Sequence, residues 1–274
     1  MHLLRLALTG RWLGVVTMTT VFAVASVSLG QWQFDRRDYA REQIELLESN
    51  YDAPAVSISE LIPSLDSEPR DVKWRSAKLT GRYLADDTRY VRNRIMQGTI
   101  GFEQLVPFQL ASGDVFIVNR GWVPADAKYA NPRVTPEPSV ELLTVYVRLY
   151  PDESVVSGRG APAGQIATIN ADSFASPSSP SVYTGFYGQL VREEPEGSTG
   201  ALGSKPLLDE GPHLSYALQW YVFALMAYFG YGWALVKEAR GEAPINNDSK
   251  RRPRASRAPR DEDIEDAAVA SAGR

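Results

Sequence analysis

The feature that most constrains this chain is a run of 24 residues near its C-terminal end, His213 to Val236, which contains no Asp, Glu, Lys or Arg. At a rise of about 1.5 Å per residue, a helix of this length reaches across the hydrocarbon core of a bilayer. A second uncharged run, the 18 residues from Trp12 to Leu29, lies near the N-terminus. Because lipid offers no partners for backbone N–H and C=O groups, both runs are predicted to be transmembrane helices.

The first run has a second interpretation, as a cleaved signal peptide. Ala23-Val24-Ala25 followed by Ser26 resembles a small-residue cleavage site after a short apolar core. Apolar character continues to Leu29, which favours a retained anchor. With either interpretation the middle of the chain lies outside and the C-terminal run stays in the membrane.

Basic residues lie beyond the outer end of each run, namely Arg5, Arg11, Lys237, Arg240 and the cluster Lys250 to Arg252. Cytoplasmic flanks carry such an excess of Lys and Arg, so both termini are predicted to be cytoplasmic and the middle extracytoplasmic. Arg36, Arg37 and Arg41 lie on the opposite side, but they begin a segment of about 180 residues, and long segments are translocated largely regardless of charge. The expected location is the cell membrane, as a multi-pass protein.

The resulting organisation has five parts: a cytoplasmic N-terminus (1–11), a transmembrane helix (12–29), an extracytoplasmic domain (30–211), a second transmembrane helix (212–236) and a cytoplasmic basic tail (237–274). From Gln31 to Gly211 there are 18 Lys and Arg against 25 Asp and Glu, a net of −7, whereas residues 237–260 carry 8 against 3, a net of +5. This distribution argues against nucleic acid as a partner and favours contact of the tail with anionic lipid, or a solvated tail without partner. The tail has few large apolar residues, so it is predicted to be disordered.

The composition also excludes several kinds of chemistry. The chain has no cysteine, two histidines and four methionines. Disulfides, thiolate metal sites and covalent c-type haem attachment are therefore excluded, and a soft-ligand copper site is disfavoured. A Ser-His-Asp triad would need His213 at a membrane boundary, and no zinc-protease, phosphate-loop or dinucleotide motif occurs. A Ser-Lys dyad has lysines available but no local motif, so no enzymatic activity is expected.

The middle of the chain is predicted to be one mainly β domain. Apolar and β-branched residues alternate in seven runs separated by Gly, Pro, Asn and Asp: Val72–Leu84, Thr88–Arg92, Gly101–Leu110, Val115–Asn119, Leu142–Tyr150, Gln165–Asn170 and Thr184–Val191. Ser112-Gly113-Asp114 indicates a hairpin turn between two of them. Such runs, with little room for crossover helices, favour an antiparallel barrel or sandwich. The fold class is thus a membrane-anchored α+β protein with two transmembrane helices that bracket an extracytoplasmic domain.

Helix and loop signals surround this β region. Phe34 to Ser49 is predicted to extend the first transmembrane helix outward, with Tyr39, Ile44 and Leu47 as its apolar stripe. Pro and Ser gather in Ala175 to Ser181, which predicts a loop. Gly, Ser and Glu gather in Glu193 to Ser204, which predicts a second loop that leads to the last helix.

Five blocks of residues together resemble the surfeit locus protein 1 family. In chain order they are Leu29-Gly30-Gln31-Trp32-Gln33 with Arg36, Leu79-Thr80-Gly81-Arg82-Tyr83, Val91-Arg92-Asn93-Arg94 with Gly98 and Gly101, Val118-Asn119-Arg120-Gly121-Trp122-Val123-Pro124, and Gly211-Pro212-His213-Leu214-Ser215-Tyr216-Ala217-Leu218-Gln219-Trp220. The extension beyond Ala239 is not part of that pattern.

The resemblance implies an assembly factor for haem-copper cytochrome c oxidase that binds haem a and assists its insertion into the catalytic subunit. Its expected partners are that subunit, haem a synthase and the lipid bilayer. The alternative is a membrane-tethered scaffold that holds oxidase subunits together and binds no haem.

The candidate haem site is the start of the second transmembrane helix. An imidazole at a helix N-terminus faces the positive end of the dipole, which favours the neutral ring that a metal ligand requires. His213 is thus the candidate axial ligand of haem iron, with Tyr216 and Trp220 on its helical face. The alternative is an interfacial histidine beside an aromatic belt. Gln31, Trp32 and Arg36 are expected to pack against the second helix near His213.

Arg120 has two interpretations. Its guanidinium can hold a haem propionate or a partner's carboxylate in a bidentate manner. Alternatively it pairs with an aspartate of its own domain at the end of a strand. Gly121, before the large Trp122, is expected to serve a turn, and Gly81-Arg82-Tyr83 is expected to be structural.

The predicted topology can be tested with reporters that are active only in the cytoplasm. A reporter fused after Arg240 is expected to be active, and one fused near Asp126 inactive, because the basic flanks retain both termini inside. Activity measured in intact cells checks this, and the reverse pattern would contradict the orientation.

Overall fold

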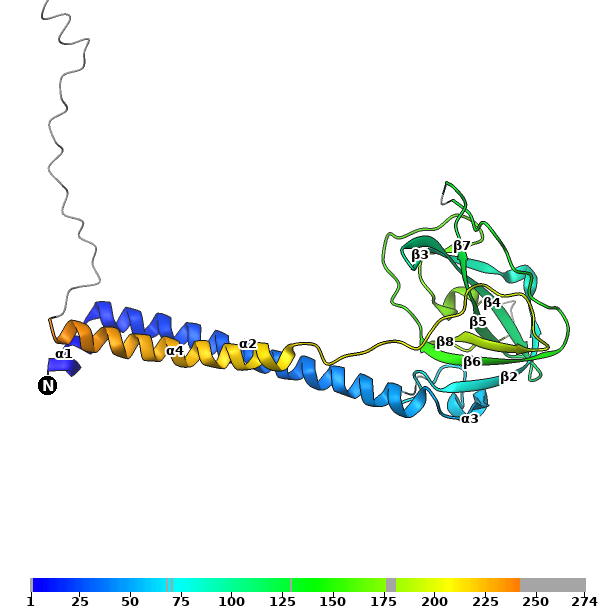
Figure 1. Cartoon of the computed structure of the whole chain (residues 1–274). Helices are drawn as coiled ribbons and strands as arrows, with labels where there is room; N and C mark the ends of the chain where they lie inside the picture. Colours follow the sequence, from blue (N-terminus) through cyan, green and yellow to red (C-terminus); the bar gives the residue numbers. More distant parts are fainter. Residues whose placement is uncertain (1, 68, 70, 129, 176–180, 242–274) are drawn as a thin grey trace, which may run out of the picture. The chain divides into compact units, whose positions relative to one another are not determined.

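The computed structural model describes residues 2–67, 69, 71–128, 130–175 and 181–241 (Figure 1). These residues form two compact units, one from the chain up to Phe34 and from Leu214 onward, the other from Asp35 to His213. Most of the predicted tail and of the predicted loop at 175–181 lies outside the described residues.

The first unit is helical. A short helix, α1 (His2–Ala7), precedes α2 (Gly10–Asn50), and α4 runs over His213–Ala239. Within the described part of the chain, α2 is the one helix that is long and apolar enough to cross a membrane. Helix α4 has sufficient length with 27 residues, but its many tyrosines and tryptophans lower its mean hydropathy. One helix compatible with a membrane span is therefore shown where the sequence predicted two.

Helix α4 packs antiparallel on the first part of α2, as Figure 1 shows. Contacts advance in opposite directions along the two helices: Gly30 with Tyr221, the Tyr228 hydroxyl with the Thr20 hydroxyl at 3.0 Å, Trp12 with Tyr231 at 5.6 Å between ring centroids, and Arg11 with Glu238 at 3.1 Å. Small residues, Ala217, Ala224, Ala23 and Ser26, are buried in the helices. Small side chains of this kind let helix backbones approach closely, as in membrane helix pairs.

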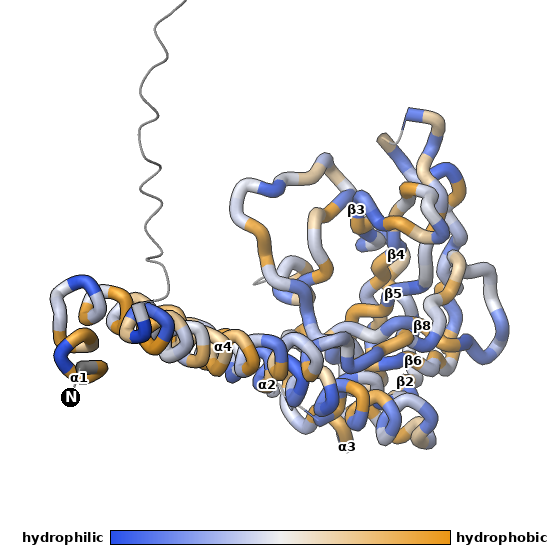
Figure 2. Tube along the Cα trace, turned by 60° about the vertical axis from the view of Figure 1, so that its left-hand side comes forward, coloured by the Kyte–Doolittle hydropathy of each residue, from blue (hydrophilic) through white to orange (hydrophobic). Residues whose placement is uncertain are grey.

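The later part of α2 belongs to the second unit, and Figure 2 shows hydrophilic residues gathering there. Leu47 is buried, and the Asn50 side-chain amide at the helix end donates to the carbonyls of Asp71 and Lys73 at 2.6 and 2.9 Å. The predicted helical extension is confirmed. Tyr39 is 55% exposed, however, so the apolar stripe does not include it. Tyr39 lies five residues from Ile44, about 140° around the helix.

The second unit contains a mixed sheet. Its strands are β1 (Val56–Ser57), β2 (Ser76–Tyr83), β3 (Arg89–Met96), β4 (Thr99–Leu110), β5 (Val115–Pro124), β6 (Leu143–Pro151), β7 (Gln165–Ile166) and β8 (Phe186–Glu194). Short helices α3 (Ile58–Leu61), η1 (Ala85–Asp87) and η2 (Ala171–Phe174) lie between them. Each of the seven predicted runs overlaps one of these strands. The two-residue β1 was not predicted, because it is too short to show alternation.

The strands follow the order β1-β2-β6-β8-β5-β4-β3-β7, and β2 also pairs with β4. The antiparallel pairs include β3–β4, β4–β5, β2–β6 and β6–β8, whereas β1–β2, β3–β7 and β5–β8 are parallel. The prediction of a mainly β domain is confirmed, and its sheet is mixed, whereas the predicted barrel or sandwich is not shown. Parallel pairing arises where a long segment, in place of a hairpin, returns the chain to the sheet. The predicted hairpin turn lies between β4 and β5, with Gly113 at φ 94°.

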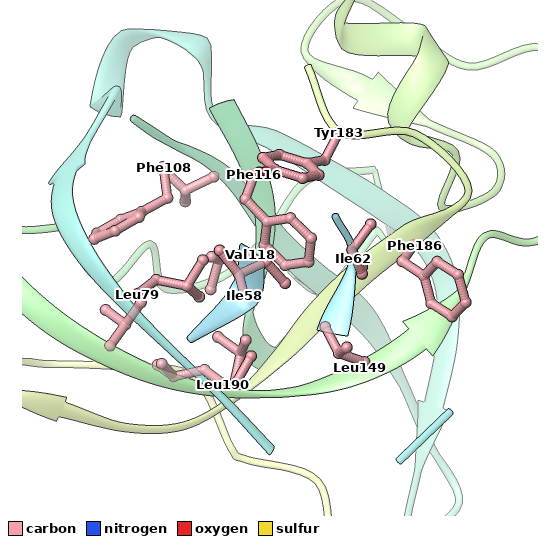
Figure 3. Packing of buried hydrophobic residues seen from close by; sticks show 14 of the residues in the cluster. Ile58, Ile62, Leu79, Phe108, Phe116, Val118, Leu149, Tyr183, Phe186 and Leu190 are labelled. Atoms are coloured by element: carbon pink, nitrogen blue, oxygen red, sulfur yellow. The ribbon is translucent and has the colours of Figure 1, made fainter. Parts of the chain in front are cut away.

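Alternation of the side chains builds the core. In β2 and β6 every second residue is buried, whereas β5 is buried almost throughout. Figure 3 shows the main cluster, in which Phe116, Val118, Leu149 and Leu190 from three strands meet Ile62 after α3. A second cluster gathers around Ile117 and Leu105 on the other side of β5. Because β5 is covered by both clusters, any polar side chain on it must be satisfied within the protein.

Candidate functional site

Arg120, on β5, is completely enclosed, with 0% of its surface exposed. Its Nε donates to Glu193 Oε1 at 3.0 Å, and its Nη2 to Glu193 Oε2 at 3.5 Å. Nη1 donates to Gln104 Oε1 at 3.1 Å and to the Pro136 carbonyl at 3.3 Å, and Nη2 donates to the Ser198 carbonyl at 2.8 Å. A guanidinium has five N–H donors, and these five bonds use them all.

Tyr83 completes this buried network from β2. Its hydroxyl donates to Glu193 Oε1 at 2.8 Å, and the Arg120 guanidinium lies over its ring, 4.9 Å from the centroid. Burial raises the pKa of Tyr83 far above its ordinary value, and the negative charge of Glu193 raises it further. The phenol therefore stays protonated and serves as a donor to the carboxylate.

The network decides between the two interpretations of Arg120. The guanidinium pairs within its own domain, with a glutamate where an aspartate was expected, and no donor points outward to a propionate or a partner. Binding of an external carboxylate would require breaking a buried ion pair, which costs several kcal/mol. The structure thus favours a structural role for Arg120 and removes its support as a cofactor-binding residue.

Trp122, two residues after Arg120 on β5, forms a second packed group with Arg94. The Trp122 indole N–H donates to the Arg94 carbonyl at 3.0 Å, and its ring fills the space where Gly101 lacks a side chain. The Arg94 guanidinium pairs with Glu153 at 2.6 Å and Glu103 at 3.2 Å. Burial raises the pKa of Glu103, and the charge of Arg94 opposes that rise. These residues hold the β3–β4 hairpin to β5.

Gly121 has the structural role that was predicted for it. Its φ is 105°, a conformation that residues with a side chain rarely adopt. A Cβ there would lie 2.8 Å from the backbone of Gly200 and Ala201. The close approach lets the connecting segment after β8 pair with Trp122, whose N–H donates to the Ala201 carbonyl at 2.9 Å.

His213 is the first residue of α4, at the place predicted. Gly211 just before it has φ 67°, and its N–H donates to the Asp209 side chain. The imidazole Cδ2 and Nε2 atoms lie 3.4 Å from the position of a Cβ on Gly211. The ring therefore folds back over a turn that has no side chain to displace it, and it is partly exposed.

Tyr216 and Trp220 follow on α4, one and two turns after His213. Tyr216 is 48% exposed, and Trp220 is partly buried, with its ring edge-on to Phe223 at 5.7 Å between centroids. Spacings of three and seven residues place all three on one side of the helix, as predicted. This side carries an imidazole and two aromatic rings.

The packing of Gln31, Trp32 and Arg36 near His213 stays a prediction. All three are exposed, Trp32 by 53%. Gly30 and Phe34 face α4, since a Cβ on Gly30 would meet the Tyr221 ring at 2.8 Å and the Phe34 ring lies 6.1 Å from the same ring. Residues 30 and 34 share one helix face, whereas residue 32 lies about 200° away.

The model of the SURF1 family matches residues 20–225 of the chain. The chain belongs to the SURF1 family. Uncharacterised SURF1-like proteins of Mycobacterium bovis and Mycobacterium tuberculosis are each 31% identical to it over 234 residues, which cover 84% of this chain and 85% of theirs. A SURF1-like protein of Dictyostelium discoideum is 24% identical over 107 residues, or 37% of this chain and 40% of that protein.

The SURF1 blocks that the sequence offered separately come together in space. Tyr83 and Arg120 from two blocks meet on Glu193, and Arg94 and Trp122 from two blocks meet beside Gly101. Gly30 of the first block contacts Tyr221, the residue that follows the last block. Tyr83, Arg94, Arg120 and Trp122 therefore serve packing, whereas the His213 imidazole at the start of α4 is partly exposed.

Sequence reasoning missed Glu193 and Gln104, the buried partners of Arg120. Burial along β8 follows every second residue up to Leu190 and then shifts, so that Glu193 faces inward. The cause is a β-bulge in its pairing with β6, between Tyr146 and Val147. A bulge reverses the direction of the side chains that follow, and a single sequence carries no signal for it.

The buried pair gives a stability prediction. Arg120→Met is expected to lower the free energy of unfolding by about 3–5 kcal/mol, because Glu193 is left buried and unpaired. In a domain of this size the melting temperature falls by about 2–4 °C per kcal/mol, to be measured by thermal denaturation of the full chain in detergent.

Two further variants control this prediction. Arg120→Met with Glu193→Leu is expected to lose less stability than the sum of the single variants. Arg192→Met, which breaks an exposed pair with Glu194, is expected to change stability by less than about 0.5 kcal/mol. Equal losses for Arg120→Met and Arg192→Met would contradict the account.

Proposed function

We propose that this SURF1-family protein is an assembly factor for haem-copper cytochrome c oxidase that binds haem a through His213 and assists its insertion into the catalytic subunit. The observation that carries the proposal is the imidazole at the start of α4, folded over Gly211 with aromatic residues on the same helix face. The oxidase as partner and haem a as cofactor are proposed from the family resemblance. The protein acts as a carrier, without catalysis of its own.

The packing of α4 supports a membrane location for it. Since α4 lies antiparallel along the apolar part of α2, a bilayer crossed by α2 also surrounds α4. Lipid-facing residues such as Leu225 and Phe229 are 72% and 78% exposed. Two antiparallel spans return the chain to its starting side, and the basic flanks assign that side to the cytoplasm of the cell membrane.

The side chains at the start of α4 are of the types that bind a haem. A partly exposed imidazole is a common axial ligand of haem iron, and Tyr216 and Trp220 offer ring faces and edges to a flat macrocycle. Haem a, when bound, supplies the iron that this nitrogen coordinates. The chain supplies the ligand and its orientation, and Arg120 plays no part because its donors are all used inside the β domain.

A scaffold without haem is the second candidate. The observation that favours it is an apolar tip on the β3–β4 hairpin, where Ile95 is 72% and Ile100 40% exposed. Exposed apolar side chains grouped in this way are typical of interaction surfaces. A scaffold of this kind would hold oxidase subunits through the outer domain and would purify without colour.

Absorbance of the purified protein tests the proposal. The full chain, co-expressed with haem a synthesis, is expected to show a Soret band, and His213→Ala is expected to lose most of the bound haem, because the iron loses its protein nitrogen. Trp220→Leu is expected to weaken binding by a smaller factor, since it removes ring contact and leaves the iron bond.

Folding of each variant is checked by near-ultraviolet circular dichroism, and Tyr228→Phe, which loses only the bond to Thr20, serves as the control on the same helix. Stoichiometric haem with unchanged ligand-field bands in His213→Ala would falsify ligation by His213. A colourless wild-type protein that copurifies with an oxidase subunit would instead support the scaffold.

A further inference from the structure

The segment from Pro195 to Pro212, which joins β8 to α4, has no helix or regular strand, yet it is attached along its length. Near its start, the Ser198 carbonyl accepts from Arg120 at 2.8 Å, and the Ala201 N–H donates to the Trp122 carbonyl at 2.7 Å. In its middle, Lys205 Nζ donates to Asp52 Oδ2 at 2.7 Å. The path of the segment is thus fixed at several points before it reaches His213.

The last attachment is an ionic clasp of Glu210 with two arginines of α2. Glu210 Oε2 lies 3.0 Å from Arg37 Nε, and Glu210 Oε1 lies 3.4 Å from Arg41 Nε. Arg37 and Arg41 are four residues apart on one helix face, where like charges repel each other. A carboxylate between the two arginines relieves this repulsion. Each carboxylate oxygen of Glu210 pairs with a different arginine, so two contacts restrain the position of the side chain.

The clasp lies three residues before His213. Between them Gly211 adopts φ 67°, and its N–H donates to Asp209 on the other side of Glu210. Since Gly211 has many accessible backbone conformations, its observed one must be selected by its neighbours. Glu210 is held by α2, and the Asp209 side chain accepts from the Gly211 N–H, so the two residues before this glycine restrain it and with it the first residue of α4.

We propose that Glu210, held by Arg37 and Arg41, is a positioning residue that sets the orientation of the His213 imidazole. This inference rests on the proposed haem-binding function, because orientation matters for a ligand that must meet a metal along its nitrogen lone pair. The role of the clasp is geometric. Its side chains are partly exposed, so its contribution to overall stability is small.

The two histidines of the chain make the orientation measurable without haem. The full chain, labelled with ¹³C at the imidazole Cε1 and held in detergent micelles, gives one ¹H–¹³C resonance for each histidine. His213→Ala assigns them. In Glu210→Gln the His213 resonance is expected to shift and to broaden or split, because the ring then samples more than one orientation over the Gly211 turn.

Three variants make the test specific. Glu196→Gln makes the same chemical change at an exposed position of the same segment and is expected to leave the His213 resonance unchanged. Arg41→Gln, which removes the longer contact, is expected to have a smaller effect than Glu210→Gln. Arg37→Glu with Glu210→Arg exchanges the charges and is expected to restore a single sharp resonance, since the carboxylate introduced at position 37 would then lie between two arginines.

A second readout separates positioning from stability and from the proposed function. The melting temperature of Glu210→Gln is expected to stay within about 2 °C of the wild type. Ferric haem a, titrated into wild type and Glu210→Gln, is expected to bind Glu210→Gln about tenfold more weakly and with altered ligand-field bands.

An unchanged His213 resonance in Glu210→Gln, or no recovery in the charge exchange, would overturn the positioning role even if the wild type binds haem. Wild-type protein that binds no haem would overturn the proposed function, while the resonance still reports whether the clasp orients the ring.

Discussion

The buried ion pair of Arg120 and Glu193 is the interaction on which the β domain depends. It joins β5 to β8 directly, reaches β4 through Gln104, and accepts the Tyr83 hydroxyl from β2. Its fifth bond goes to the Ser198 carbonyl, so the same guanidinium also fixes the start of the segment that leads to α4. A charge enclosed in this way is tolerated only when every donor is satisfied, which ties the position of each strand to that of the others.

Much of the fold could be predicted from the sequence, because alternating burial leaves a signal in each long strand. The seven strands, the hairpin at Gly113 and the helical extension of α2 all follow from such patterns. What could not be predicted depends on contacts between distant segments. The parallel pairing of β5 with β8 and the bulge that turns Glu193 inward have no local signal. The second transmembrane helix stays a prediction, because the aromatic residues that suit a membrane interface also lower the hydropathy of α4.

The candidate site was predicted in part. His213 was predicted because it is a lone histidine at the start of an uncharged run. Tyr216 and Trp220 were predicted because helical spacing places them on the same face as His213. Arg120 was ambiguous, since a conspicuous arginine looks the same in the sequence whether its partner is a ligand or a buried glutamate. The clasp at Glu210 was not predicted, because it joins residues 173 positions apart and neither segment contains a sequence signal for the contact. Residues of the SURF1-family blocks thus include a buried structural group within the β domain and a partly exposed histidine at the start of α4.

The β domain is held together by satisfied buried charges, and the partly exposed His213 imidazole lies at the start of α4. The central claim is that this imidazole carries haem a to the oxidase. The most direct measurement is the ratio of haem a to catalytic subunit in oxidase purified from cells that lack the protein, complemented with wild type or with His213→Ala. The account predicts a partial loss of haem a that wild type restores and His213→Ala does not, with normal synthesis of the subunit. Full haem a occupancy in the absence of the protein would contradict it.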